Sequence, residues 1–286
     1  MKPVRVLTIA GSDSGGGAGI QADLKTITVL GGFGMSVITA LTAQNTLGVH
    51  GIHDVPPAFV AAQFDAVATD IGIDAAKTGM LATSEVLRVI AGKIRQYGIE
   101  KLVVDPVMVA KGGMSLIRED AKKTMIAELI PLALVLTPNI PEAEVLSGIR
   151  IATLADMKEA ARIIRNLGAR HVVVKGGHLA GDAEDLLYDG REFRIFSAPR
   201  IATEDTHGTG CTYSAALATC LGRGMDVAGA VAETKRYITE AVRYAWRVGG
   251  GHGPTNHLAP LFNPGVAGEA GRPESWKTAG YYDSDR

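Results

Sequence analysis

The chain has 286 residues, 47% of them hydrophobic and 21% charged, the balance of a soluble globular protein. Lys and Arg total 29 against 30 Asp and Glu, a formal net charge of -1. Nucleic-acid and membrane-surface proteins usually carry a basic excess, so this composition argues against both classes. The start runs directly into a strand pattern without an apolar signal region, and no apolar run reaches membrane-spanning length, so we expect a cytoplasmic protein.

Strands alternate with helices along most of the chain. Short apolar, β-branched runs predict strands over residues 4–10, 35–43, 75–78, 101–105, 134–137 and 171–175. Helical spacing of apolar residues predicts helices over 18–30, 57–69, 84–97, 157–167, 208–221 and 227–248. Because the strands are apolar throughout, we expect an α/β fold with a mainly parallel sheet covered by helices on both faces.

One segment departs from this alternation, and the end of the chain differs in composition. Residues 184–188 and 192–196, joined through Asp189-Gly190, predict a hairpin that adds antiparallel strands to the sheet edge. We see no internal repeat or linker and predict one domain over residues 1–260. Residues 261–286 are rich in Gly, Pro, Ser and charge, which predicts a loosely packed or disordered tail.

The segment Thr206-His207-Gly208-Thr209-Gly210-Cys211-Thr212 leads directly into an Ala-rich helix. The first N–H groups of a helix have no intrahelical partners, and together with the helix dipole they favour a bound anion such as a phosphate. From two glycines alone, an ordinary helix start is the more frequent explanation. No Gly-Lys-Ser/Thr follows, so this is not a P-loop, and the early Gly15–Gly19 loop lacks the dinucleotide-binding spacing.

Further motifs occur in a specific order along the chain. They are Ala10-Gly11-Ser12-Asp13-Ser14-Gly15-Gly16-Gly17 continuing to Asp23, Thr39-Ala40-Leu41-Thr42-Ala43-Gln44-Asn45, Lys77-Thr78-Gly79-Met80, Val104-Asp105-Pro106-Val107-Met108, Leu136-Thr137-Pro138-Asn139 with Glu142, and Gly251-His252-Gly253-Pro254. With Gly208-Thr209-Gly210-Cys211, this order resembles the hydroxymethylpyrimidine/phosphomethylpyrimidine kinases, a branch of the ribokinase-like superfamily, over residues 4 to 260. Most of that superfamily has Asp where this chain has Cys211. The pyrimidine kinases share the cysteine with a group of pyridoxal kinases.

The resemblance implies a ribokinase-like three-layer α/β/α sandwich, ATP and Mg²⁺ as cofactors, and a homodimer. It implies phosphorylation of the small molecule 4-amino-5-hydroxymethyl-2-methylpyrimidine, followed by phosphorylation of its monophosphate to the diphosphate, for thiamine synthesis. Two alternatives stay open. One is a pyridoxal kinase, because pyridoxal also carries a hydroxymethyl group on an aromatic ring. The other is a pyrimidine-binding protein without catalysis.

The resemblance also assigns roles to single residues. The catalytic turn is Gly208, Thr209, Gly210 and Cys211, the pyrimidine wall is Gly11, Asp23, Gln44, Met80 and Val107, the ATP contacts are Asn139, Lys175 and Lys235, and the Mg²⁺ ligands are Asp105 and Glu142. The chemistry of these side chains fits. The Asp23 carboxylate accepts from an exocyclic amine, the Gln44 amide both donates and accepts, and two carboxylates at neighbouring strand ends suit a hydrated Mg²⁺. Asn139 is equally suited to cap a helix.

Three smaller expectations complete this set. The helix dipole at Cys211 is expected to lower the thiol pKa and favour thiolate. Lys111-Gly112-Gly113 predicts a flap over the site. Cys211 and Cys220 lie nine positions apart on one predicted helix, which excludes a disulfide between them, and the spacing of His252 and His257 fits no common metal site.

Overall fold

The computed structural model describes residues 2–108, 116–177 and 181–259. Within them, one sheet of nine strands has the order β3-β2-β1-β4-β5-β6-β7-β8-β9. The strands are β1 (Val4–Asp13), β2 (Gly32–Asn45), β3 (Gly48–Asp54), β4 (Ala75–Thr78), β5 (Leu102–Val104), β6 (Val135–Leu136), β7 (His171–Lys175), β8 (Ala183–Tyr188) and β9 (Phe193–Ala198). In sheet order, the six neighbouring strands β2, β1, β4, β5, β6 and β7 pair in parallel. Strand β3 at one edge and strands β8 and β9 at the other edge pair antiparallel.

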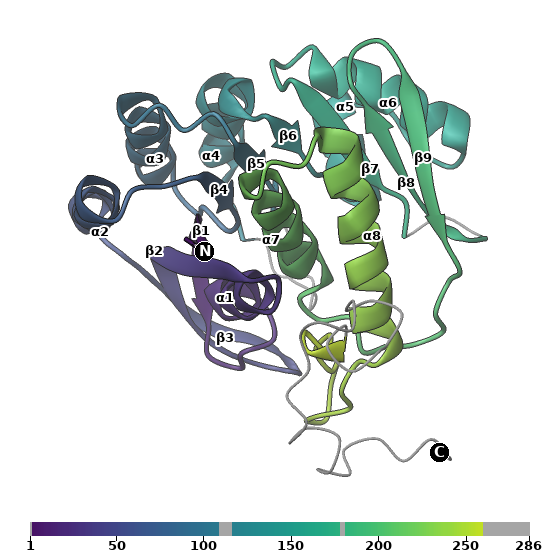
Figure 1. Cartoon of the computed structure of the whole chain (residues 1–286), viewed down its shortest axis with the longest axis horizontal. Helices are drawn as coiled ribbons and strands as arrows, with labels where there is room; N and C mark the ends of the chain where they lie inside the picture. Colours follow the sequence, from purple (N-terminus) through teal and green to yellow (C-terminus); the bar gives the residue numbers. More distant parts are fainter. Residues whose placement is uncertain (1, 109–115, 178–180, 260–286) are drawn as a thin grey trace.

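Helices cover both faces of this sheet (Figure 1). On one side lie α1 (Gly19–Val29), α7 (Thr209–Gly222) and α8 (Val227–Arg243). On the other side lie α2 (Pro57–Asp70), α3 (Ser84–Gln96), α4 (Glu119–Thr124), α5 (Ile140–Ser147) and α6 (Leu154–Arg165), with a π-helical turn at Met125–Leu129 and a 3₁₀ turn at Ile130–Leu132. The predicted three-layer α/β/α fold with an antiparallel edge hairpin is confirmed.

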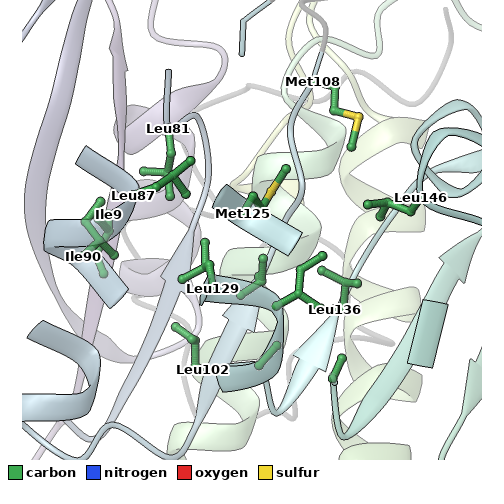
Figure 2. Close-up of a cluster of buried hydrophobic side chains, with 14 of the residues drawn as sticks. Ile9, Leu81, Leu87, Ile90, Leu102, Met108, Met125, Leu129, Leu136 and Leu146 are labelled. Carbon is green, nitrogen blue, oxygen red and sulfur yellow. The ribbon is translucent and has the colours of Figure 1, made fainter. Parts of the chain in front are cut away.

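Alternating side chains of the central strands divide the core into two layers. In β5, Leu102 and Val104 face the α2–α6 layer, whereas Val103 faces α7 and α8. Figure 2 shows part of the first layer, where Ile90 of α3 and Leu129 pack with residues of the strands. Since the central strands bury both faces, their sequences are mostly apolar, with buried exceptions such as Thr8 and Lys77, and this is why they were predictable.

The structure differs from the sequence prediction at several element boundaries. Strand β3 was not predicted, because its sequence Gly48–Asp54 is rich in Gly and His and much of it is exposed. Strand β1 continues through Asp13, beyond the predicted end at residue 10, after a register shift between Ala10 and Ser12. Helix α8 ends at Arg243 and not at 248, because the Trp246 N–H donates to the Pro254 carbonyl and the chain turns back.

Two predicted segments lie outside the described residues: the flap at 111–113 and the tail at 261–286. No helix in the described part of the chain is both long enough and apolar enough to span a membrane.

A buried histidine near the end of the described chain forms hydrogen bonds with α7 and α8. His257 is 2% exposed, its Nε2 lies 3.1 Å from the Thr212 hydroxyl, and its carbonyl accepts a hydrogen bond from the Tyr237 hydroxyl at 2.9 Å. Burial, helped by the positive charge of Lys25, lowers the pKa of His257 to about 4. The ring is therefore neutral in the folded protein at neutral pH.

This histidine predicts a loss of stability in acid. Between pH 6.5 and 4 the unfolded chain takes up a proton at His257 that the folded chain does not, so unfolding becomes easier as the pH falls, by about 3 kcal/mol in total. Glu142, whose folded pKa is raised, acts in the opposite direction in an overlapping range. We therefore expect the effect in the difference between wild type and His257→Asn, measured by urea unfolding from pH 7 to 4. Parallel curves for the two proteins would contradict this assignment.

Candidate active site

A cavity of about 890 Å³ opens where the parallel strands end. It joins the loop after β1, the ends of β2 and β4–β7, and the beginning of α7, which is the edge where α/β proteins place their ligands. Of the predicted site residues, all except Asp23 line it: Gly11, Gln44, Met80, Asp105, Val107, Asn139, Glu142, Lys175, Gly208, Thr209, Gly210, Cys211 and Lys235.

The beginning of α7 has free backbone donors that face this cavity. Gly208 is the N-cap, with φ 80° and no capping side chain, and its carbonyl accepts the Thr212 N–H at 2.9 Å. Among the described residues, no acceptor takes the N–H of Gly210 or Cys211. Two N–H groups at the positive end of a helix form a site for an anion.

Close packing requires glycine at the N-cap. A Cβ on Gly208 would lie 1.8 Å from the carbonyl oxygen of Gly17, whereas one on Gly210 would meet its nearest neighbours at 3.5 and 3.6 Å, an ordinary contact distance. The first position therefore excludes any side chain, and the second leaves room for one. The glycine loop after β1 and the beginning of α7 consequently lie backbone against backbone.

A lysine and a carboxylate complete the anion site. The two atoms closest to a Cβ placed on Gly210 are Asp105 Oδ2 and Lys175 Nζ. Lys175 Nζ also donates a hydrogen bond to Asp105 Oδ1 at 2.9 Å. Burial alone would disfavour the ammonium, but Asp105 and Glu142 outweigh it and raise the pKa of Lys175. The lysine therefore stays positively charged beside the free N–H groups and adds a fixed cation to the anion site.

Glu142 lies next to this pair and titrates near neutrality. Its Oε2 accepts the Asn139 N–H at 2.9 Å, and the Asn139 side chain accepts the Glu142 N–H at 2.9 Å, a capping box at the beginning of α5. Asn139 is thus a helix cap that also lines the cavity. Burial raises the pKa of Glu142 to about 7; Lys175 opposes this and Asp105 adds to it.

The pair Asp105 and Glu142 fits a hydrated Mg²⁺ better than a closed metal cage. No group of three or more His, Cys, Asp or Glu suited to a metal occurs in the described part of the chain. Mg²⁺ usually keeps several waters and binds one or two carboxylates together with substrate phosphates. Burial disfavours the ionised form of Glu142 and raises its pKa, so a cation beside this carboxylate would favour its charged form.

A second ion pair faces the same cavity. Lys235 Nζ of α8 lies 3.0 Å from Asp185 Oδ2 of β8, and Asp185 Oδ1 accepts the Gly176 N–H at 3.2 Å. The sequence prediction contained Lys235 but not Asp185. The signal available for Asp185 was a charged residue directly before the buried Leu186 and Leu187 in a predicted strand.

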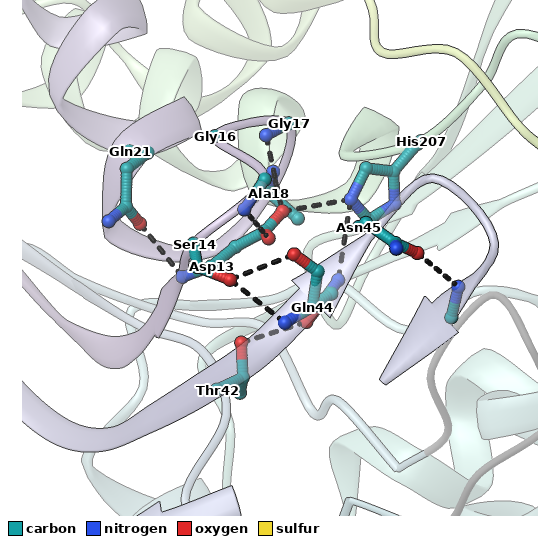
Figure 3. Close-up of polar contacts among 12 residues, drawn as sticks. Asp13, Ser14, Gly16, Gly17, Ala18, Gln21, Thr42, Gln44, Asn45 and His207 are labelled. Carbon is teal, nitrogen blue, oxygen red and sulfur yellow. Dashed lines mark hydrogen bonds and ion pairs between the residues drawn. The ribbon is translucent and has the colours of Figure 1, made fainter. Parts of the chain in front are cut away.

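At the other end of the cavity, one buried carboxylate organises the loop after β1 (Figure 3). Asp13 accepts the N–H groups of Gly15, Gly17 and Ala18 at 2.8, 3.1 and 2.8 Å, and its Oδ2 lies 2.9 Å from His207 Nε2. Burial opposes ionisation, but His207 and these N–H groups prevail and lower the pKa of Asp13. His207 directly precedes Gly208, so its hydrogen bond from Nε2 to Asp13 links the loop after β1 to the beginning of α7.

The predicted pyrimidine residue Gln44 belongs to this group. Its Nε2 lies 3.4 Å from His207 Nε2, and its Oε1 accepts from the Thr42 hydroxyl at 3.1 Å. Since the imidazole donates at Nε2 to Asp13, it cannot accept there, and the Gln44 N–H₂ remains available to a ligand. Asp13 and His207 stood inside the motifs but received no role from the sequence, because only the fold brings them together across 194 residues.

Two sequence expectations need correction. Asp23 does not line the cavity; it is fully buried, and Lys77 Nζ donates to both of its carboxylate oxygens at 3.1 and 3.0 Å. In the structure its carboxylate is thus paired inside the protein and is not exposed to the cavity. Cys211 does line the cavity, but burial raises the pKa of its thiol to about 12, so desolvation outweighs the helix dipole and the free protein carries a thiol, not a thiolate.

Comparison with known proteins agrees with this geometry. Residues 13–256 match the family model described as phosphomethylpyrimidine kinase. The chain belongs to this family. A hydroxymethylpyrimidine/phosphomethylpyrimidine kinase of Bacillus subtilis is 50% identical over 261 residues, which cover 91% of this chain and 96% of that protein.

Two further proteins are similar to this chain, one in sequence and one in structure. The thiamine biosynthesis bifunctional protein ThiED of Geobacter sulfurreducens is 58% identical over 254 residues, 88% of this chain but only 52% of that protein, so the chain spans about half of it. Among solved structures, an ADP complex of Bacillus subtilis pyridoxal kinase is similar with a TM-score of 0.86 and 39% identity, over 92% of this chain and 100% of that one. The family membership makes this chain a phosphotransferase.

The two glycines of the α7 turn provide a matched pair of variants. We expect Gly208→Ala to lower the free energy of unfolding by more than about 2 kcal/mol, because it adds left-handed strain and a clash with Gly17. Gly210→Ala should melt within about 2 °C of wild type and yet lose activity, because its methyl group fills the space beside Lys175 and Asp105. Calorimetry and a kinase assay on both variants test this; equal melting points would refute the packing argument.

Proposed function

We propose that this chain transfers the γ-phosphoryl group of ATP to the hydroxymethyl oxygen of 4-amino-5-hydroxymethyl-2-methylpyrimidine, and then phosphorylates the resulting monophosphate to the diphosphate. The observation that carries the proposal is a single cavity. It brings the free N–H groups of the α7 turn and the Lys175 ammonium together with the Gln44 amide and the apolar side chains of Met80 and Val107. Donors suited to a phosphate and apolar side chains suited to an aromatic ring thus line one space.

The chain's residues act mainly by positioning. The acceptor oxygen attacks the γ-phosphorus, the bond to the β,γ-bridging oxygen breaks, and ADP leaves while the acceptor proton is released. The N–H groups of Gly210 and Cys211 and the ammonium of Lys175 compensate the charge on the transferred group. Because the transition state is loose, a base contributes little, and a protonated Cys211 is compatible with this chemistry.

Mg²⁺ is part of the proposal. Asp105 and Glu142 would hold it, largely through water, and when bound it would neutralise the triphosphate. Gln44 would hold the pyrimidine ring edge, between Gly11 and Met80 on one side and Val107 on the other. Lys235, fixed by Asp185, and Asn139 would face ATP. A homodimeric, cytoplasmic enzyme is what the family resemblance adds.

Pyridoxal kinase activity is the second candidate, favoured by the structural similarity to the Bacillus subtilis pyridoxal kinase. ADP release, measured with the pyrimidine, its monophosphate and pyridoxal, separates the candidates. We expect turnover with both pyrimidines, at least about tenfold lower kcat/KM with pyridoxal, and at least about a hundredfold loss in Lys175→Met, which removes the phosphate-facing charge. Turnover with pyridoxal alone would replace the proposal by the second candidate, and no turnover with any of the three would leave a binding protein.

A cysteine in place of the superfamily's aspartate has a physical reason in the second step. The acceptor is then a phosphate, and a fixed carboxylate at position 211 would repel it, with Asp105 already close by. We expect Cys211→Asp to reduce kcat/KM for the monophosphate at least about tenfold more than for the pyrimidine. Cys211→Ser, which keeps a neutral side chain, is the control and should affect both steps alike. Equal losses in Cys211→Asp would contradict the explanation.

A further inference from the structure

An ion pair with no contact to solvent lies next to Gly79, which precedes the cavity residue Met80. We call this part of the cavity the acceptor end. Lys77 of β4 and Asp23 of α1 are each 0% exposed, and the Thr8 hydroxyl of β1 donates to Asp23 Oδ2 at 2.5 Å. Thr8 and Lys77 are register partners in the parallel pair β1–β4. Two donor groups, the Thr8 hydroxyl and the Lys77 ammonium, therefore make three hydrogen bonds to one carboxylate beside the centre of the sheet.

Stability alone does not explain this pair. Placing two charges in the core costs several kcal/mol each in desolvation, and well-packed apolar residues usually serve a core equally well. The flanking residues of β4, Ala75 and Ala76, are indeed fully buried and apolar. Burial disfavours the Lys77 ammonium, but Asp23 outweighs it and raises the pKa of Lys77, so the positive charge persists. A fixed charge retained at such a cost suggests an electrostatic role.

The pair is placed to act on Cys211. Lys77 Nζ lies 3.1 Å from where a Cβ of Gly79 would stand, and Gly79 precedes the cavity residue Met80. Helix α7, which carries Cys211 in its first turn, packs against β4, β1 and α1, the three elements that supply Lys77, Thr8 and Asp23. Gly19, at the beginning of α1, also lines the cavity and donates its N–H toward Cys211.

The charges around Cys211 come from several elements and have both signs. Burial raises the pKa of the Cys211 thiol most; Lys77 opposes the rise, whereas Asp23 and Asp105 add to it. Lys175, at the end of β7, is a further cation coupled to Cys211. Asp23 therefore has two effects. It stabilises the positive charge of Lys77, and at the Cys211 thiol its own negative charge opposes the effect of Lys77.

We propose that Lys77 and Asp23 are positioning residues for the acceptor end of the site: Lys77 supplies a fixed positive charge below Cys211, and Asp23 holds this charge and balances it. In the kinase reaction, a role that rests on the proposed function, the same charge stabilises negative charge that develops on the acceptor oxygen beside Cys211. Neither residue touches the substrate.

The first test reads the charge at Cys211 without any substrate. In a Cys220→Ala background only Cys211 reacts, and the second-order rate of its alkylation by iodoacetamide at pH 8 follows the thiolate fraction. We expect Asp23→Asn to accelerate alkylation at least about tenfold, because Lys77 then takes the thiolate as its counter-ion and one pKa unit corresponds to a factor of ten. The double variant Lys77→Met/Asp23→Asn should lose this acceleration, and Lys77→Met alone should show none.

If the substitutions only loosened the packing, the alkylation rates of the variants would follow a different pattern. The experiment therefore distinguishes a structural role from an electrostatic one. If the single Asp23→Asn and the double variant both accelerate alkylation by the same factor, access and not charge is responsible, and the proposal is overturned. No acceleration in a natively melting Asp23→Asn protein overturns it as well. Should Asp23→Asn not fold, the double variant, which buries no charge, still decides: a folded double variant alkylated at least about tenfold faster than its parent contradicts the proposal.

The second test uses turnover. We expect the double variant to reduce kcat about tenfold with both pyrimidine acceptors, while KM for ATP changes less than about twofold, because the pair lies at the acceptor end. An unchanged kcat, or a loss confined to KM for ATP, overturns the role in the reaction. If the wild type turns over none of the three acceptors, the proposed function fails, and the alkylation pattern still decides on the charge at Cys211.

Discussion

The approach of two backbones, at Gly17 and at Gly208, is the constraint on which the site depends. Gly208 adopts a left-handed conformation at the N-cap of α7, and the Gly17 carbonyl occupies the space where any side chain would stand. This contact fixes the direction of the free N–H groups of α7 relative to the loop after β1. The anion site is therefore held by backbone geometry, and it needs little reorganisation when a ligand enters.

Charge alternation along the cavity is the second organising feature. Asp105 pairs with Lys175, and Asp185 with Lys235, so neither lysine presents an isolated charge in the free protein. Glu142 is the additional carboxylate; burial raises its pKa, Lys175 opposes the rise and Asp105 adds to it. A triphosphate brought together with a divalent cation would compensate both signs, whereas a triphosphate alone would meet Asp105 and Glu142 as like charges.

Burial keeps the titratable side chains at the beginning of α7 uncharged. Cys211 lies in a helix N-terminus that should favour thiolate, and yet burial dominates and keeps the thiol protonated. His257, on the opposite side of the same helix turn through Thr212, is kept neutral by the same desolvation. The first turn of α7 is thus uncharged on its side chains, and its capacity for an anion resides in the main chain.

The sequence by itself determined the layered α/β fold, the antiparallel edge hairpin and the family, because buried parallel strands are mostly apolar and the glycine-containing motifs follow one another in order. Local pattern also located the turn at Gly208 and the strand-end polar residues Asp105 and Lys175. The tertiary structure alone decided which polar side chains meet. Asp23 follows a cavity-lining loop in sequence, but its position on α1 directs it to Lys77 across 54 residues, and Asp13 finds His207 in the same way. Such pairings depend on which strands become neighbours and on side-chain direction in the folded core, and no local periodicity encodes either.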